Sequence, residues 1–235
     1  MYPILFQIGP ITIYSHGIMV ALGILAGGFI IFRLAKIEGL KTAKLFDIIL
    51  YSLIAALVGG RLLYVAVYPY QFSSFWDVLA VWQGGMVSYG GIVAGLTVAI
   101  YLLYKQKENV WRWLDIFVVA LIFGWGIGRI GCLLAGDIIG KITNSGIGMR
   151  FPAIDENTRH PVALYESITS IVIFGVLYFL FQVRNLKDGI LAHIGLILFF
   201  AISLFAALQI FYPYFSSVSL FDRLKPIKIK GEFRP

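Results

Sequence analysis

The sequence predicts an all-α, polytopic transmembrane helical bundle, on two observations. Hydrophobic residues make up 60% of the 235-residue chain and charged residues only 13%, and the mean hydropathy is +0.87. A soluble domain of this length needs a polar surface that such a composition does not supply. The apolar residues also gather into six runs, at 13–32, 47–68, 86–104, 115–136, 161–182 and 190–212. Each run is long enough to cross a bilayer, and in lipid each must be a helix to satisfy its own backbone.

The composition also narrows the classes of function. Cys132 is the only cysteine, which excludes an intramolecular disulfide and a cysteine-cluster metal site. The three histidines are scattered along the chain, so we expect no metal ion and no cofactor. The net charge is +7, but the basic residues lie between apolar runs. There they act as topology signals and contacts for anionic lipid, not as a nucleic-acid surface.

The charge of the loops predicts the orientation of the chain. Four basic residues lie between positions 33 and 44, three between 105 and 112, and two at 184 and 187, whereas segment 69–85 has none. The positive-inside rule therefore places the N-terminus, segment 69–85 and an external loop at 137–160 outside. The first residues lack the basic start of a secretory signal, so the first helix is expected to be retained. The basic C-terminal tail, 213–235, works against this orientation, but the earlier loops agree. The whole chain, 1–235, is expected to be one integral membrane domain.

Arg129 lies near the end of the fourth run, within Gly124-Trp-Gly-Ile-Gly-Arg-Ile-Gly131. A guanidinium at membrane depth is costly and requires a partner, so Arg129 is a candidate functional residue. The glycines leave helix faces open to a second backbone or a lipid headgroup. They also match a dinucleotide-binding fingerprint, which we reject because the stretch follows a long apolar helix instead of a strand. The structural alternative is helix packing, with Arg129 reaching toward the interface.

Polar groups from four predicted helices fall at the same depth of the outer leaflet. Arg61 and Arg129 are both expected in the outer half of the membrane. Tyr89 and the polar start of the fifth helix, 160–166, are expected at that level too. Because arginine recognises phosphate through a fixed fork of donors, this convergence predicts a site for an anionic lipid.

Five residues are candidates for acid–base chemistry at this site: Tyr89, His16, His160, Asp137 and Glu166. Each also has a structural interpretation that the sequence leaves open. These interpretations are an interfacial tyrosine for Tyr89, a core histidine for His16, a helix start for His160, a helix end for Asp137 and charge neutralisation of an arginine for Glu166. Cys132 is interpreted as buried packing.

Four motifs follow one another in a set order: Gly59-Gly-Arg-Leu-Leu-Tyr64, Trp82-Gln-Gly-Gly-Met-Val-Ser-Tyr-Gly-Gly91, Gly128-Arg-Ile-Gly131 followed by Gly136-Asp-x-x-Gly140, and His160-Pro-x-x-Leu-Tyr-Glu166. With Asp115 and the predicted topology, they resemble the bacterial phosphatidylglycerol–prolipoprotein diacylglyceryl transferase family, from residue 1 to about 200. The resemblance implies a transferase of the bacterial cytoplasmic membrane with its active site toward the outer leaflet. Such an enzyme moves the diacylglyceryl group of phosphatidylglycerol onto the lipobox cysteine thiol of a preprolipoprotein. It releases glycerol phosphate and needs no metal.

The resemblance also implies roles for individual residues. Arg129 would bind the lipid phosphate, Arg61 and Glu166 would support the same polar cavity, and Tyr89 would handle the proton of the substrate thiol. The implied catalytic residues are Tyr89, Arg129, Glu166 and Asp137. The implied substrate-binding residues are Arg129, Arg61, His16, Gly90, Gly91, Gly140, His160 and Tyr165.

The chain departs from the family pattern at three of these motif positions. Cys132 stands where the family has asparagine, Asp137 where it usually has glutamate, and His16 where it usually has tyrosine. A C-terminal motif of arginine and glutamate and a seventh spanning helix are not evident. Two alternatives therefore stay open. One is an altered relative that binds or moves anionic phospholipid without transfer, and the other is a membrane protein whose embedded charges only stabilise packing.

Overall fold

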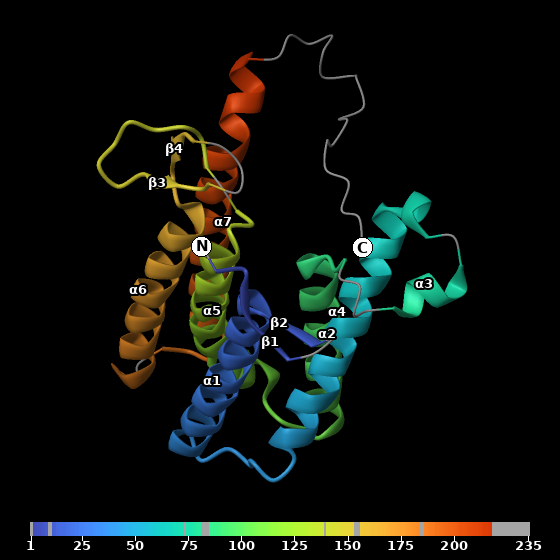
Figure 1. Ribbon diagram of the computed structural model, residues 1–235. Coiled ribbons are helices and arrows are strands. Elements are labelled where there is room, and N and C mark those ends of the chain that lie inside the picture. Colours follow the sequence, from blue (N-terminus) through green and yellow to red (C-terminus); the bar gives the residue numbers. More distant parts are fainter. Residues whose placement is uncertain are drawn as a thin grey trace. The chain divides into compact units, whose positions relative to one another are not determined.

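The computed structural model describes residues 2–8, 11–72, 74–80, 85–138, 140–152, 156–183 and 186–217. Six helices in this part of the chain are long and apolar enough to cross a membrane. Their bounds are α1 Ser15–Ile37, α2 Leu45–Val67, α4 Ser88–Lys105, α5 Val110–Ala135, α6 Val162–Val183 and α7 Ile190–Ser217 (Figure 1). The predicted all-α fold with six spanning helices is confirmed. Of the predicted basic tail, 213–235, residues 218–235 lie outside the described residues.

The helix α5 begins five residues before the predicted apolar run because a polar cap starts it. Asn109 precedes the helix, and its side-chain oxygen accepts from the backbone N–H of Trp111 at 3.2 Å and of Arg112 at 3.4 Å. Asparagine at this position satisfies donors that the first turn of a helix leaves unpaired. A sequence pattern based on hydropathy misses this first turn because Arg112 and Asp115 interrupt its apolar residues.

Short elements between the spanning helices were not predicted. They are the antiparallel hairpin β1 Ile4–Ile8 with β2 Ile11–Tyr14, the 3-10 turn η1 Pro69–Gln71, the helix α3 Phe75–Leu79, and the hairpin β3 Met149–Arg150 with β4 Thr158–Arg159. The helix α3 has a capping box, in which the Ser74 backbone N–H donates to Asp77 Oδ2 at 2.9 Å. Each element is too short for hydrophobic periodicity to reveal it.

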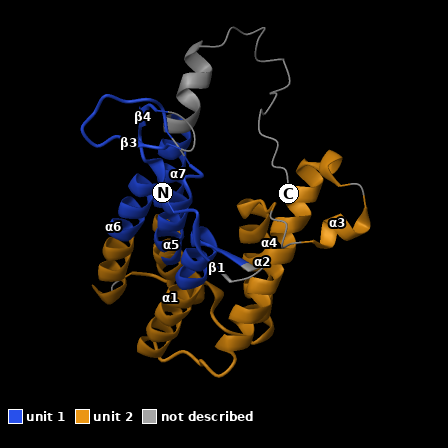
Figure 2. Cartoon of the chain, viewed as in Figure 1, with its two compact units in different colours: residues 1–23, 124–173, 196–235 blue, residues 24–123, 174–195 orange. Residues whose placement is uncertain are grey.

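The chain divides into two compact units, which are described separately (Figure 2). Unit 1 comprises residues 1–23, 124–173 and 196–235, and unit 2 comprises residues 24–123 and 174–195. The helices α1, α5, α6 and α7 contribute residues to both units.

In unit 2, α2 packs along α4 through small residues (Figure 1). A Cβ on Gly91 would lie 3.0 Å from the carbonyl oxygen of Ala56, and a Cβ on Gly95 would lie 3.0 Å from that of Ser52. Glycine therefore permits a backbone approach that a larger side chain would obstruct. This is the usual way in which helices associate where lipid removes the hydrophobic driving force.

Unit 2 also contains a long-range helix cap. The buried carboxylate of Asp115, on α5, accepts from the backbone N–H groups of Gly189 and Ala192, both at 2.7 Å. These N–H groups belong to the start of α7, where helix donors lack partners and the dipole favours a negative charge. Asp115 is therefore an anchor for the sixth spanning helix.

In unit 1, α1 crosses α5 at paired glycines. A Cβ on Gly23 would lie 2.6 Å from the carbonyl oxygen of Gly124, and a Cβ on Gly124 would lie 2.8 Å from that of Gly23. About two turns further along α5, a Cβ on Gly131 would lie 2.9 Å from Met19 Cβ and 3.1 Å from His16 Cα. The prediction that these glycines admit a second backbone is confirmed for Gly124 and Gly131, which meet α1, whereas a Cβ on Gly128 would meet nothing within 4 Å.

Candidate functional site

Arg129, on α5, pairs with Glu166, on α6, in unit 1. Their Nε and Oε2 atoms are 3.0 Å apart, and the two side chains are 17% and 4% exposed. Neither atom meets hydrogen-bond geometry, so the contact is an ion pair between two largely buried groups. The Trp125 ring lies one helical turn before Arg129, with its centroid 4.4 Å from the guanidinium carbon. The predicted partner of the embedded arginine is thus Glu166.

The outer nitrogens of Arg129 are less engaged than its Nε. The Nη1 atom contacts Cys132 Sγ at 3.9 Å, a weak interaction, and Nη2 has no hydrogen-bond partner among the described residues. Because Nε is held by Glu166 and the guanidinium lies against Trp125, these two nitrogens are kept in a defined position. They form a fork of donors suited to the oxygens of a phosphate.

A second cluster, formed by His16, Cys132 and Asp137, adjoins Arg129. The distance from Cys132 Sγ to His16 Nδ1 is 3.6 Å, and that from His16 Nδ1 to Asp137 Oδ2 is 3.9 Å. We call these three residues the His–Cys–Asp cluster. They are also the three residues that the motif resemblance predicts to differ from the family pattern.

The fold holds His16 in this cluster from two sides. Gly131 lets the first turn of α1 approach α5 closely, as described above. The buried Ser15 hydroxyl donates to the carbonyl oxygen of Tyr2, and the Tyr2 N–H donates to the carbonyl oxygen of Leu134 at 3.0 Å. The start of α1 is therefore fastened to the end of α5, where Cys132 lies.

Three predicted site residues lie together near the start of α6: Gly140 and His160 precede the helix, and Tyr165 is in its first turn. Gly140 donates its N–H to the carbonyl oxygen of His160 at 2.9 Å, and His160 Nδ1 is 3.0 Å from the Tyr165 hydroxyl oxygen. A Cβ on Gly140 would lie 2.8 Å from His160 Cβ. Glycine is thus required for this close backbone contact beside His160.

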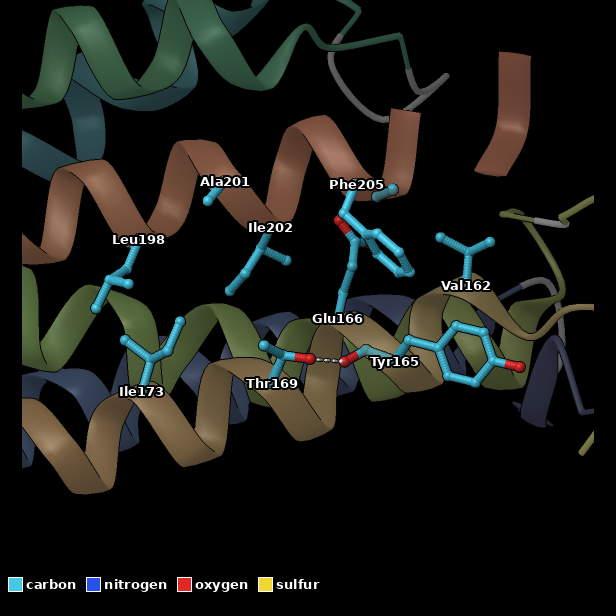
Figure 3. A pocket seen from close by; sticks show the side chains of 10 residues that line it. Val162, Tyr165, Glu166, Thr169, Ile173, Leu198, Ala201, Ile202 and Phe205 are labelled. Carbon is cyan, nitrogen blue, oxygen red and sulfur yellow. Dashed lines mark hydrogen bonds between the residues drawn. The ribbon is translucent and has the colours of Figure 1, made fainter. Parts of the chain in front are cut away.

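A cavity of about 260 Å³ opens between α6 and α7 within unit 1. Figure 3 shows Glu166 extending from α6 toward α7, beside Phe205. Glu166 is the one charged residue of the described lining. The other lining residues are Val162, Tyr165, Thr169, Ile173, Leu198, Ala201, Ile202, Phe205 and Ala206. The cavity is therefore an apolar space that meets the Arg129–Glu166 pair at Glu166.

In unit 2, Arg61 donates to four backbone carbonyl oxygens and is 6% exposed. Its Nε donates to Val78 at 2.9 Å, Nη1 to Gly85 at 2.9 Å, and Nη2 to Asp77 at 2.6 Å and Ala80 at 3.2 Å. These bonds fasten the segment around α3 to α2. The donors of Arg61 serve the backbone in this structure, whereas those of Arg129 are left available.

The predicted residues of the second motif are in unit 2 as well. Tyr89 is 63% exposed, at the start of α4. Gly90 and Gly91 face α2, where a Cβ on Gly90 would lie 2.6 Å from Leu63 Cβ. Of this motif, residues 82–84 lie outside the described residues. That Arg61 and Tyr89 share one site with Arg129 stays a prediction.

Sequence reasoning assigned Cys132 to packing and did not place it beside His16. A partial signal was present, because Trp125, Arg129 and Cys132 are spaced by four and three residues and therefore share one face of a helix. Nothing in the sequence places His16 against that face, since 116 residues separate it from Cys132.

Comparison with known proteins agrees with the resemblance of the motifs. A family model described as prolipoprotein diacylglyceryl transferase matches residues 3–212. The phosphatidylglycerol–prolipoprotein diacylglyceryl transferase of Tolumonas auensis is 35% identical over 204 residues, covering 85% of this chain and 79% of the relative. The protein of that name from Rickettsia conorii is 37% identical over 191 residues, covering 79% and 74%. That from Rickettsia canadensis is 37% identical over 205 residues, covering 84% and 78%.

The family model covers most of the chain, and the relatives match it over most of their own length. The six apolar helices agree with a multi-pass membrane protein. The chain therefore belongs to the prolipoprotein diacylglyceryl transferase family, and it is a membrane transferase of that family.

Proposed function

We propose that this chain transfers the diacylglyceryl group of phosphatidylglycerol to the lipobox cysteine thiol of preprolipoproteins and releases glycerol phosphate. The names of its relatives support the reaction. The observation that carries it for this chain is the Arg129–Glu166 pair beside an apolar cavity, because it leaves two guanidinium nitrogens available for an anion. We further propose that the reaction takes place in the outer leaflet of the cytoplasmic membrane, as the loop charges predict.

The first step is binding of the lipid. The headgroup phosphate accepts from Nη1 and Nη2 of Arg129, while Glu166 holds Nε and balances the charge. An acyl chain enters the cavity between α6 and α7, whose lining is apolar apart from Glu166 and the hydroxyl-bearing side chains. Glu166 thus stands where the polar and apolar parts of a phospholipid meet.

The second step is the transfer. The sulfur of the acceptor cysteine bonds to the glycerol carbon next to the phosphate, and the carbon–oxygen bond to the phosphate breaks. The electron pair leaves with the oxygen of glycerol phosphate, so negative charge grows on the phosphate. Arg129 stabilises that charge, and in a dry site such stabilisation is large. The thiol proton goes to a base, and the family resemblance implies that Tyr89 has this role.

A second candidate function is binding of anionic phospholipid without transfer. The observation in its favour is the His–Cys–Asp cluster, because it replaces three side chains of the family pattern at the site. One experiment separates the two functions. The purified full chain is incubated with phosphatidylglycerol and a lipobox peptide, and peptide mass and released glycerol phosphate are measured.

Transfer predicts one added diacylglyceryl group per peptide and equimolar glycerol phosphate. A peptide with serine in place of the lipobox cysteine is the control and should gain no mass. A folded protein that binds phosphatidylglycerol but releases no glycerol phosphate, beside an active relative, would refute the transfer function and support the second candidate.

A further inference from the structure

The His–Cys–Asp cluster brings together three different donor types. His16 Nδ1, Cys132 Sγ and a carboxylate oxygen of Asp137 all lie within 4.8 Å of one another. Cys132 is buried, His16 is partly exposed and Asp137 is exposed. The three come from the first turn of α1, the last part of α5 and the segment after it.

The geometry of the cluster does not fit a nucleophilic relay. In a cysteine–histidine–aspartate relay, the thiol and the carboxylate contact opposite nitrogens of the imidazole. Here Cys132 Sγ and Asp137 Oδ2 both approach Nδ1, at 3.6 Å and 3.9 Å. A thiol and a carboxylate that approach the same nitrogen leave no path for a proton through the ring. They do leave three donor atoms within 4.8 Å of one another.

The spacing fits the edges of a metal coordination tetrahedron. Zinc binds sulfur at about 2.3 Å and imidazole nitrogen at about 2.0–2.1 Å, which places these two ligand atoms about 3.6 Å apart. Cys132 Sγ and His16 Nδ1 have this spacing. The carboxylate is somewhat further than a ligand would be, but Asp137 is 52% exposed and follows the end of α5. Coordination would require its side chain to move closer, which its exposed position permits.

The charges also balance. A Cys132 thiolate and the Asp137 carboxylate would neutralise a divalent cation, while Arg129 is already neutralised by Glu166. The mixture of thiolate, imidazole and carboxylate suits zinc or a similar ion better than magnesium or calcium, which prefer oxygen ligands alone. Three protein ligands leave one coordination position for another molecule, as in catalytic zinc sites.

We propose that His16, Cys132 and Asp137 bind a thiophilic divalent cation of the zinc class, with an open position that takes the acceptor cysteine thiol. The second half of this proposal rests on the proposed transfer function. Arg129 Nη1 lies 3.9 Å from Cys132 Sγ, so the metal would lie next to the bound phosphate. Coordination makes the acceptor thiol give up its proton to the base of the proposed transfer more readily, because a metal-bound thiol is deprotonated. The resulting thiolate sulfur is the atom that bonds to the glycerol carbon when glycerol phosphate leaves.

Metal loading of the purified full chain tests the site. The protein in detergent is stripped with a chelator, loaded with Zn²⁺ or Co²⁺ and desalted, and metal per chain is measured by mass spectrometry. We expect one equivalent, and binding weakened about tenfold or more in each of His16→Gln, Cys132→Ser and Asp137→Asn. The Co²⁺ form should show a sulfur-to-metal charge-transfer band that is absent from Cys132→Ser. Thermal unfolding of each variant checks that it is folded.

His193→Gln is the matched control and should bind metal normally. Its Nδ1 is 2.6 Å from the carbonyl oxygen of Gly189, its ring stacks on Trp111, and it belongs to unit 2. A wild-type protein that takes up no metal yet transfers lipid would overturn this proposal and leave the proposed function standing. Metal uptake that persists in all three cluster variants would also overturn it.

The acceptor position is tested with the Co²⁺ form and the lipobox peptide. The cysteine peptide should intensify the charge-transfer band, and the serine peptide should not. A band that the cysteine peptide leaves unchanged would overturn the open-position part. A peptide-sensitive band in a protein without transfer would support the metal site and refute the transfer function instead.

Discussion

Replacement of Arg129 by lysine is the sharpest test of the phosphate fork. Arg129→Lys keeps one positive charge on a long side chain, but an ammonium is a single point of contact. In the structure three parts of Arg129 are engaged or available: Nε against Glu166, the guanidinium plane against Trp125, and the two outer nitrogens. A lysine ammonium can stay with Glu166 or contact the phosphate, but it cannot hold both in the same geometry.

The expected effect follows from the hydrogen bond that is lost. A hydrogen bond to a charged group contributes about 1.5–3 kcal/mol. If it is lost from the transition state, turnover falls about 10- to 150-fold. Glycerol phosphate release is measured at saturating peptide for wild type and variant, with thermal unfolding measured in parallel. The matched control is Arg112→Lys, because Arg112 forms an ion pair with Glu38 in unit 2 and should keep wild-type turnover.

A folded Arg129→Lys protein with near-wild-type turnover would refute this reasoning. Arg129 would then be a residue that neutralises Glu166 and packs on Trp125. An equal loss of turnover in Arg112→Lys would show that the assay reports general damage to arginine ion pairs and not the fork.

Three further outcomes are expected. Glu166→Gln leaves the largely buried Arg129 without its counter-ion, and loss of one partner of a buried pair lowers the free energy of unfolding by about 3–5 kcal/mol. An unchanged melting temperature would contradict this. Asp115→Ala removes both acceptors at the start of α7, and the free energy of unfolding should fall by about 0.5–2 kcal/mol in chemical unfolding in detergent. Asp115→Asn should recover part of this loss. Equal stability of wild type and both variants would contradict the cap. The orientation is tested with single cysteines at positions 74, 107 and 145 in a Cys132→Ser background. An impermeant thiol reagent added outside should label positions 74 and 145 but not 107. Labelling of position 107 alone would show that the predicted orientation is reversed.

Arg61 shows that a sequence can predict that a residue needs partners without predicting which groups they are. The sequence predicts that an embedded arginine needs partners, and the structure supplies them as four backbone carbonyl oxygens from the segment after α2. The partners are carbonyl groups, which every residue carries, so no side-chain pattern marks them. In the structure the donors of Arg61 serve these carbonyl groups, while Arg129 keeps donors available for a ligand.

The sequence by itself determined the six spanning helices and the family. Long apolar runs have one stable form in lipid, because only a helix satisfies its own backbone hydrogen bonds. Helical spacing along one segment also sufficed to put Trp125, Arg129 and Cys132 on one face. These properties depend on residues that are near one another in the chain.

The tertiary structure alone decided which distant residues meet. Glu166 rather than another acid pairs with Arg129. Asp115 accepts from the backbone of Gly189, 74 residues later, and His16 lies against Cys132, 116 residues away. Such contacts depend on where helices cross, and the crossing of α1 and α5 is set by glycines that remove side chains at Gly23, Gly124 and Gly131. Glycine spacing shows that a close approach is possible, but the identity of the approaching helix depends on the packing of the whole chain.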